Sequence, residues 1–391
     1  EVDPDIKTVI GGIHTAIYPE RLLSFSCVDY LVTGEGEIRF PQLIKAIEEN
    51  KEPDIDGVSY KNKNGKTIII PATRKIEDLD SIPFPARHLV DYEGYIKIGV
   101  PFAPFPRRER VAQILTSRGC PYKCNFCSSV NYWGRKFRVR SVDNVIQEID
   151  ELVTKYNIQE IQFVDDNLTI DGKRAKELFS RMIDYDLVWC TPNGLNVNHL
   201  DGEMIDLMAK SGAYQLSVAV ESGSQEILNN VIHKPIDLKK VKPIVDRAHK
   251  NRISVHGMFI VGFPGETKEQ ILRTLDFPKK IGFESVSFFI ATPLPGSELY
   301  DECMEKGYLV DKAYKELDFE KMDFKSVNIR IPRDSKDYTI DPQELTDLVD
   351  KRTREYNEWS KKKYPEKWKE KYKLYLEKHP EGADIITGRV T

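Results

Sequence analysis

Cysteine is scarce in this sequence, and long apolar runs are absent from it. Six cysteines in 391 residues do not make a disulfide scaffold. No apolar run approaches the roughly 18–20 residues that span a bilayer. The first residues carry no charged segment followed by an apolar one, so neither a transmembrane segment nor a signal peptide is expected. The formal net charge of −4 gives no overall sign of nucleic-acid binding. We therefore expect a cytoplasmic protein with reduced thiols.

What is present is ordinary for a globular protein with a sizeable core, namely 40% hydrophobic and 31% charged residues. The length exceeds that of one typical domain and predicts two or three modules. The sequence starts with Glu1 rather than Met, in the middle of a pattern, so we expect that the true N-terminus lies further upstream.

From residue 111 onward, strand-like runs alternate with amphipathic helical segments. Strands are expected at 111–116, 159–164, 187–191, 214–220, 253–260 and 284–290, and helices at 141–156, 171–185, 201–211, 237–250 and 266–281, with one more after 296. This alternation predicts an α/β fold with a parallel sheet, as an open sheet or as a complete or partial barrel. In each case the active site belongs at the carboxyl ends of the strands.

The remaining chain divides around this core, which is expected to span residues 111–305. Residues 1–75 are typical of the C-terminal part of an α/β domain, with a turn at 34–37, a helix at 40–49 and a hairpin at 57–71. Residues 76–110 are rich in proline and aromatics and are expected to form a linker.

Residues 306–391 are expected to form a helical C-terminal region. Within it, the lysine- and aromatic-rich stretch 351–379 is typical of an amphipathic helix that packs on the core. RNA binding through its basic and aromatic residues is one alternative, and a cap over the open side of a partial barrel is another.

Three of the cysteines, Cys120, Cys124 and Cys127, form a C-x3-C-x2-C loop directly after the first strand of the core. Three thiolates on one short loop can converge on one face of a [4Fe–4S] cube and leave the fourth iron without a protein ligand. That open iron can bind the amino and carboxylate groups of S-adenosylmethionine (SAM) and pass an electron to its sulfonium. A structural zinc site is the alternative, but zinc prefers four ligands, and no fourth Cys or His lies within ten residues.

The cysteine loop resembles that of the radical SAM superfamily, whose fold is a partial barrel of six βα units, and the resemblance covers about residues 111–300. Phe126 stands where the family has an aromatic residue before its last cysteine. In the family a polar loop after the second strand contacts the methionyl amino group of SAM. The resemblance implies this role for Asp165, Asp166 and Asn167, and capping of the following helix is the alternative.

Later strand ends match the family in the expected order. After the fourth strand, the resemblance implies that Glu221 holds the ribose hydroxyls of SAM, with Ser222 beside it. After the fifth, the segment 257–267, which includes Gly262, allows close backbone approach to adenine. A Pro-Gly turn at 295–296 follows the sixth strand.

Upstream of the core, two strands end in glycine-rich turns. An α/β module of this kind directly before a radical SAM core resembles the cobalamin-binding domain of the B12-dependent radical SAM class, with the N-terminal half of that domain missing. The residues that this resemblance implies as cobalamin contacts are Gly11, Gly12, His14, Gly34, Glu35 and Gly36. The Asp-x-His-x-x-Gly segment of many such domains is absent, and many members of the class bind cobalamin without a histidine ligand. Ordinary turn chemistry for the glycines, and a surface or capping role for His14, are the alternatives.

The resemblance implies an enzyme that reductively cleaves SAM at a [4Fe–4S] cluster to a 5′-deoxyadenosyl radical, and most often a cobalamin-dependent methyltransferase acting on an unactivated carbon. A flavodoxin or ferredoxin is expected as reductant and a small molecule or lipid as substrate, with no nucleic acid. One alternative is a cobalamin-independent radical SAM enzyme, either methylthiotransferase-like or catalysing another radical rearrangement. A binding protein that carries the cluster as a redox or structural element is the non-enzymatic alternative.

Overall fold

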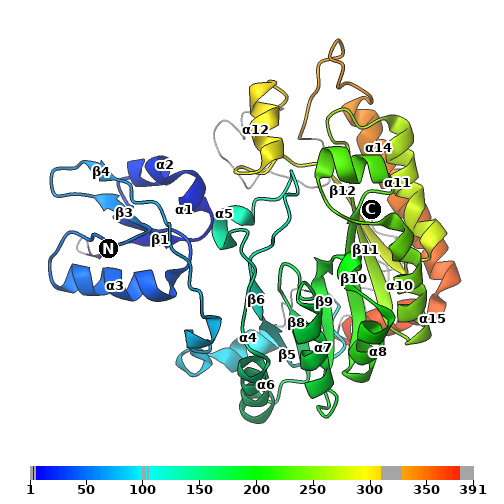
Figure 1. Ribbon diagram of the computed structural model, residues 1–391, viewed down its shortest axis with the longest axis horizontal. Helices are drawn as coiled ribbons and strands as arrows, with labels where there is room; N and C mark the ends of the chain where they lie inside the picture. Colours follow the sequence, from blue (N-terminus) through cyan, green and yellow to red (C-terminus); the bar gives the residue numbers. More distant parts are fainter. Residues whose placement is uncertain (1–2, 4–5, 99–102, 104, 310–327, 379–391) are drawn as a thin grey trace.

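Two sheets of different size lie side by side in the computed structural model (Figure 1). The structure describes residues 3, 6–98, 103, 105–309 and 328–378. The N-terminal sheet has four strands, the larger sheet has six, and a two-stranded ribbon lies between them. In the part of the chain that is described, none of the helices combines the length and the apolar character needed to cross a membrane.

The six-stranded sheet is parallel throughout, and its strands follow one another in chain order from edge to edge. They are β5 (Val111–Ile114), β8 (Glu160–Phe163), β9 (Val188–Leu195), β10 (Ala213–Glu221), β11 (Ser254–Val261) and β12 (Ser285–Ile290). The two outermost strands, β5 and β12, each pair with one neighbour and not with each other, so the barrel is open between them. The expected partial (β/α)6 barrel is confirmed.

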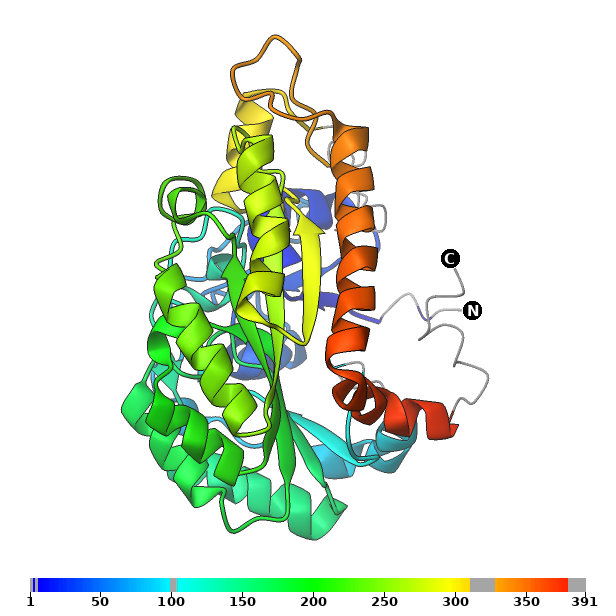
Figure 2. The same ribbon diagram turned by 90° about the vertical axis from the view of Figure 1, so that its right-hand side faces the viewer.

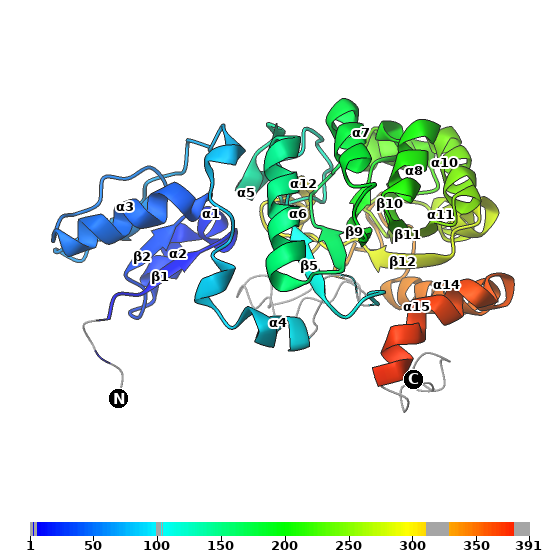
Figure 3. The ribbon, with the colours of Figure 1, turned by 90° about the horizontal axis from the view of Figure 1, so that it is seen from below.

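Amphipathic helices connect successive strands and cover the outer face of this sheet (Figure 3). They are α6 (Val142–Tyr156), α7 (Gly172–Arg181), α8 (Gly202–Lys210), α10 (Leu238–Lys250) and α11 (Lys268–Ile281). Each begins at a Ser, Asp or Thr whose side chain accepts a hydrogen bond from a backbone N–H of the first turn. Their apolar faces form the main core with the outward side chains of the strands, which leaves the strand ends for chemistry.

The N-terminal sheet joins a parallel pair, β1 (Val9–Gly11) and β2 (Tyr30–Val32), to an antiparallel hairpin of β3 (Val58–Lys61) and β4 (Thr67–Ile68). Helices α1 (His14–Ile17) and α2 (Pro19–Ser24) follow β1, and α3 (Gly36–Glu48) follows β2. The helix predicted at 40–49 therefore begins four residues earlier, at Gly36, and the predicted turn at 34–37 runs into its first turn. Glycine at that position gave no helix signal, because it is a poor helix former.

Short elements fill the segment expected to be an aperiodic linker. Leu79–Ser81 and Arg87–Leu89 form 3-10 turns, and α4 (Tyr92–Ile98) follows them. Further on, β6 (Ser117–Arg118) pairs antiparallel with β7 (Arg138–Val139), and α5 (Val130–Trp133) lies between them in the chain. The sequence did not predict α4 or this ribbon, because elements of two to seven residues carry too little periodicity.

The helix predicted after 296 is α12 (Glu298–Glu305), and the C-terminal region beyond it is helical, as predicted, with α14 (Pro342–Lys363) and α15 (Pro365–Lys378). The long α14 lies along β12, the last strand at the open side of the barrel (Figure 2). Buried Tyr356 donates a hydrogen bond of 2.7 Å to the carbonyl of Phe283, and its ring packs against Phe288. This helix thus packs its aromatic face on the core, and residue 379 of the predicted stretch lies outside the described residues.

Candidate functional site

The loop of three cysteines leaves the carboxyl end of β5 through the short strand β6. Gly119 enters it with a φ of +87°, and a Cβ at this position would lie 2.3 Å from the carbonyl oxygen of Lys136, so only glycine fits. Burial raises the pKa of both Cys120 and Cys124, and the nearby thiol of Cys127 adds to the effect in each case. The three predicted cluster ligands therefore share one space.

The environment of these thiols suits metal binding of a particular kind. Burial raises the pKa of Cys124 to about 12 and also raises that of Cys120, so metal binding must release their protons. Within the described ranges, no group of three or more Cys, His, Asp or Glu side chains is gathered as a single metal ion would require. A [4Fe–4S] cube distributes its cysteine ligands over different irons, farther apart than the ligands of one ion.

A buried lysine, not singled out by the sequence analysis, lies beside the thiols. A π-helical turn, Leu228–Ile232, and His233 with a φ of +60° precede Lys234. Its Nζ lies 2.7 Å from Oε1 of Glu221, and both side chains are buried. Burial alone would lower the pKa of Lys234, but Glu221 and Cys124 outweigh it and raise the pKa, so the ammonium remains charged.

Glu221, the predicted ribose contact, has an unusual backbone. It ends β10 after a register shift against β11 and adopts a φ of +68°, which few non-glycine residues do. Such strain gathers at functional sites, because surrounding contacts must maintain it. Here the ion pair with Lys234 provides one such contact.

Asp165, the first of three predicted SAM contacts after β8, makes its hydrogen bonds within the protein. Its carboxylate accepts hydrogen bonds from the backbone N–H of Thr116 at 3.1 Å, from the hydroxyl of Thr116 at 2.8 Å and from the hydroxyl of Ser117. Burial still raises its pKa despite these bonds. Asp165 therefore joins the carboxyl ends of β8 and β5.

The other two residues of this loop differ from each other in their hydrogen bonding. Asn167 accepts hydrogen bonds from the backbone N–H and hydroxyl of Thr169, at 3.4 and 3.3 Å. Asp166, in contrast, has a buried Oδ2 without a hydrogen-bond partner, and its charge reaches Cys120. Burial raises the pKa of Asp166, and neighbouring Asp165 adds to the effect. Of the three, Asp166 carries the available acceptor beside the cysteine loop.

Two further predicted contacts have structural partners. The hydroxyl of Ser222 lies 3.0 Å from that of Thr274 in α11, which anchors the loop after β10 to the outer helices. The ring of Phe126 lies 6.2 Å from the ring of Phe263, so an aromatic pair connects the cysteine loop to the loop after β11.

Gly262 begins the loop after β11 with a φ of +87°, and its N–H donates to Oε2 of Glu266 at 2.6 Å. The carboxylate of Glu266 is fully buried, and its Oε1 has no hydrogen-bond partner. Burial raises its pKa to about 7 although the N–H groups of Gly262 and Phe263 lower it.

Buried polar atoms without partners gather at these strand ends. Folded proteins satisfy nearly all such atoms, so exceptions point to strain or to a ligand. In the described part of the chain, those in the cysteine loop or after a barrel strand are Asn125 Oδ1, Asp166 Oδ2, Asn196 Nδ2, Ser224 Oγ and Glu266 Oε1. Acceptors suit an ammonium group, and donors suit carboxylate and ribose oxygens. These residues fit a ligand that carries the polar groups of SAM.

At the ends of the smaller sheet, two of the four predicted glycines border open space. A Cβ on Gly12 or Gly36 would meet nothing within 4 Å, whereas one on Gly11 would lie 3.6 Å from the carbonyl oxygen of Val32 and one on Gly34 would lie 3.4 Å from the Cβ of Ala72. Gly12 and Gly34 have φ values of +95° and +74°, which favour glycine.

The two predicted side chains among these residues lie differently. His14 begins α1, and its ring lies 5.5 Å from that of Tyr18. Burial lowers the pKa of His14, and so does Arg21. Glu35 is 1% exposed and is held by arginines of the barrel half.

A cavity of about 250 Å³ lies on the N-terminal half, with Thr15 and Thr33 of that half and Asn131 from α5 in its wall. The hydroxyls of Tyr18 and Tyr300 lie 3.2 Å apart and connect α1's end to α12. A second cavity, of about 470 Å³, lies between the 79–87 segment and the inner side of β5.

Sequence reasoning missed Lys234, Asn196 and Glu266. Lys234 stands thirteen residues after Glu221 in an irregular turn, so no spacing rule connects the two. Asn196 follows a strand that ends four residues later than expected. Glu266 was within reach, because a carboxylate in a glycine-rich loop after a buried strand is a polar signal in the segment already chosen.

Comparisons with known proteins agree with this geometry. The model of the radical SAM superfamily matches residues 114–277. A cytidylyl-2-hydroxyethylphosphonate methyltransferase from Streptomyces wedmorensis is 35% identical over 383 residues, which is 91% of this chain and 70% of that protein. An anaerobic magnesium-protoporphyrin IX monomethyl ester cyclase from Rubrivivax gelatinosus is 31% identical over 331 residues, or 83% of this chain and 57% of that protein.

Among solved structures, the radical S-adenosylmethionine methyltransferase TsrM from Kitasatospora setae, with cobalamin and a [4Fe–4S] cluster bound, matches with a TM-score of 0.63. It is 20% identical, and the match covers 77% of this chain and 58% of that chain, so the likeness concerns the fold. Taken with the cysteine loop and the 35% identical relative, these matches confirm the family: the chain belongs to the radical SAM superfamily and is a radical SAM enzyme.

Proposed function

We propose that this chain is a cobalamin-dependent radical SAM methyltransferase. It holds a [4Fe–4S] cluster on Cys120, Cys124 and Cys127, binds SAM at the barrel strand ends, and binds cobalamin at the glycine-rich ends of the smaller sheet. Two observations support the proposal: buried polar atoms without partners at the strand ends of the barrel, and open space beside Gly12 and Gly36 at the smaller sheet. When bound, the cluster and the corrin supply the electron that cleaves SAM and the methyl group that is transferred.

The residues of the barrel hold and orient SAM. Asp166 offers its free oxygen to the methionyl ammonium, since a carboxylate is the natural acceptor for that group. Lys234 supplies a buried positive charge for the methionyl carboxylate and for the cluster thiolates. Glu221 keeps one oxygen on Lys234 and offers the other to the ribose hydroxyls. The Phe126 and Phe263 rings keep water from the reacting atoms.

The smaller sheet holds the corrin through backbone and shape. Gly12 and Gly36 leave room over the strand ends, and Gly34 permits the turn that follows β2. His14 lies at the start of α1, and its ring is tilted against that of Tyr18 with the centroids 5.5 Å apart. In this arrangement the methyl group comes from the side of the smaller sheet and meets the substrate above the barrel.

The substrate is proposed as a small molecule, because the compounds in the names of two relatives, a cytidylyl phosphonate and a tetrapyrrole ester, are both small molecules. The two compounds are chemically unlike, so they do not narrow the choice of substrate further. A flavodoxin or ferredoxin in the cytoplasm is proposed as the reductant. The reductant follows from the requirement of the family for an external electron.

The test is anaerobic reconstitution with iron and sulfide, followed by visible spectra with and without added cobalamin. We expect a cluster band, and a corrin band that remains after desalting. A cluster band with a corrin band lost on desalting would favour the cobalamin-independent alternative.

A further inference from the structure

Glu35, predicted from sequence to contact cobalamin, lies in a buried ion-pair network between the two halves of the protein. Its Oε1 accepts hydrogen bonds from Nη1 of Arg118 at 2.8 Å and from Nη1 of Arg138 at 2.9 Å. Its Oε2 accepts from the backbone N–H of Ile76 at 2.8 Å. Both carboxylate oxygens are thus used within the protein.

The two arginines stand at the base of the cysteine loop. Arg118 ends β6, two residues before Cys120, and Arg138 begins β7, eleven residues after Cys127. They are directly paired in the β6–β7 ladder. Glu35 therefore contacts the loop region at the two points where the chain enters and leaves it.

Additional contacts strengthen the same junction. Arg138 also donates to the carbonyl of Ile76 at 2.5 Å and to that of Trp133 at 3.1 Å. Arg118 reaches Glu37 at 2.5 Å, and its guanidinium lies 4.6 Å from the ring centroid of Trp133. Trp133 belongs to α5, the short helix after the last cysteine, so that side of the loop is held as well.

The carboxylate of Glu35 is charged in this setting. Burial alone would raise its pKa, but the hydrogen bonds from Arg118, Ile76 and Arg138 outweigh burial and lower it. A buried charge that is paired and fully hydrogen-bonded contributes little net stability compared with an apolar core, but removing one partner leaves the others uncompensated. Such a network suits a junction whose geometry must be unique.

We propose that Glu35 is a positioning residue that ties the base of the cysteine loop to the Gly34–Gly36 turn, and so fixes the cluster site relative to the glycine-rich strand ends. The role of those strand ends as a second cofactor site rests on the proposed function; the tie itself does not. On this account Glu35 touches neither cofactor and acts through Arg118 and Arg138.

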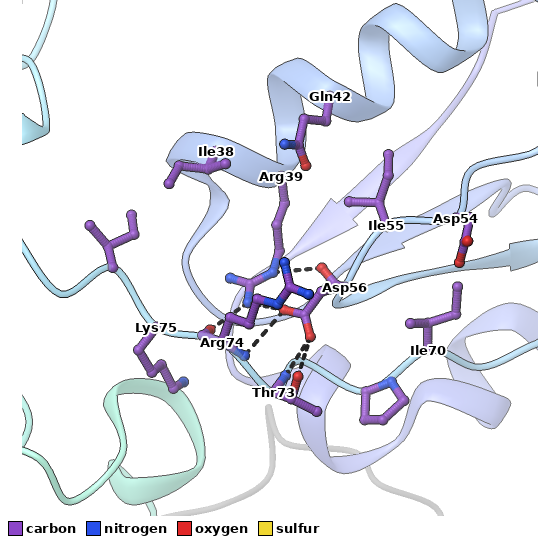
Figure 4. Close-up of a pocket in the computed structure, with 12 residues that line it drawn as sticks. Ile38, Arg39, Gln42, Asp54, Ile55, Asp56, Ile70, Thr73, Arg74 and Lys75 are labelled. Carbon is purple, nitrogen blue, oxygen red and sulfur yellow. Dashed lines mark hydrogen bonds and ion pairs between the residues drawn. The ribbon is translucent and has the colours of Figure 1, made fainter.

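The N-terminal half offers a matched control. Buried Arg39 and partly exposed Asp56 form an ion pair at 2.5 Å within this half, and Asp56 also accepts from the backbone N–H of Thr73 (Figure 4). Asp56→Asn and Glu35→Gln each replace an arginine-paired carboxylate of the same half with its amide. They differ in whether the partner belongs to the cysteine loop.

The experiment compares amide hydrogen exchange in the reconstituted wild type, Glu35→Gln and Asp56→Asn. We expect exchange in peptides covering 115–120 and 133–139 to become at least tenfold faster in Glu35→Gln, and to stay at the wild-type rate in Asp56→Asn. Unchanged exchange at the loop base in Glu35→Gln would overturn the proposal. Equal acceleration in both variants, or acceleration throughout the barrel, would also overturn it, because it would report general loosening.

Two additions keep the result independent of folding yield and of the proposed function. If Glu35→Gln does not fold, Arg118→Gln removes one arm of the same network and must give the same local pattern. In samples that retain cobalamin, electron paramagnetic resonance can measure how much the reduced cluster broadens the Co(II) signal, which depends on the distance between the two. We expect one well-defined distance in the wild type and a spread of distances in Glu35→Gln. If the proteins do not retain the corrin but Glu35→Gln shows the expected faster exchange at the loop base, only the proposed function is contradicted. If the corrin is retained but exchange in Glu35→Gln is unchanged, the positioning role of Glu35 is contradicted.

Discussion

The strand ends of the barrel and those of the N-terminal sheet present different kinds of chemistry. At the barrel, side chains such as Asp166 and Glu266 keep buried oxygens without partners. At the smaller sheet, the hydroxyls of Thr15 and Thr33 and the carboxylate of Glu35 are hydrogen-bonded within the protein. The open space there lies over Gly12 instead.

Under the proposed function, the difference teaches how each half would recognise its ligand. A small, charged ligand such as SAM needs individual side-chain groups, so the barrel leaves them available. A large, flat ligand is held by surface complementarity and backbone, so the smaller sheet supplies glycines and uses its charged groups for internal contacts. Single side-chain changes should therefore affect function more at the barrel than at the smaller sheet.

The largest effect is expected from the cysteine loop. Cys124→Ala removes one of three cluster ligands, and we expect bound iron and the cluster absorption to fall to background after reconstitution. Cys27→Ala removes an exposed thiol of the N-terminal half and should leave both at wild-type values. Retention of a full cluster in Cys124→Ala would refute the ligand assignment.

Next in size is the buried ion pair of Lys234 and Glu221. Lys234→Met leaves the carboxylate of Glu221 buried without its partner, and breaking such a pair costs about 3–5 kcal/mol. Urea unfolding of the protein should show this loss, and the double variant Lys234→Met with Glu221→Leu should recover most of it. A single variant as stable as the wild type would mean that the pair is not buried in solution.

Glu266 should make stability depend on pH. Its pKa is raised from 4.5 to about 7 in the folded protein, so the folded state holds a proton that the unfolded state releases at lower pH. Stability present below about pH 4.5 is therefore lost as pH rises through about 7, by at most about 3 kcal/mol.

Glu266→Gln has no proton to release at this position, so it lacks this loss of stability. Between pH 5 and pH 8 the free energy of unfolding of the wild type should therefore fall relative to that of Glu266→Gln. Urea midpoints at the two pH values measure the difference. Parallel pH profiles for the two proteins would show that the carboxylate ionises normally.

The smallest effects separate two adjacent aspartates. Asp165→Asn disturbs the hydrogen bonds from Thr116 and Ser117, and we expect a loss of about 2 kcal/mol in the free energy of unfolding. Asp166→Asn removes a charge without a protein partner and should change stability by less than about 0.5 kcal/mol, but weaken SAM binding about tenfold. Calorimetric titration with SAM checks the second value. The reverse pattern would exchange the two roles.

Much of the fold could be predicted, because the barrel strands and helices are long and regular. The five connecting helices begin within two residues of their predicted starts. The β6–β7 ribbon could not be predicted, since its two-residue strands exist only through pairing across twenty residues. The same is true of Glu35, whose place in a glycine-rich turn suggested a ligand contact, while its arginine partners lie more than 80 residues away.

The candidate site shows the same limit. Spacing identified Cys120, Cys124 and Cys127, since ligands on one loop are local in sequence. It could not separate Asp165 from Asp166, because which carboxylate is free depends on contacts with the neighbouring strand β5. Lys234 was out of reach for the same reason.

The central claim is that the cysteine loop and the unpartnered strand-end groups form one SAM-cleaving site. Its most direct test is to reconstitute the cluster, reduce it anaerobically, add SAM, and quantify products by mass spectrometry. We expect 5′-deoxyadenosine and methionine in equal amounts, with neither formed by Cys124→Ala. A full cluster that leaves SAM intact, or products that persist in Cys124→Ala, would contradict the account.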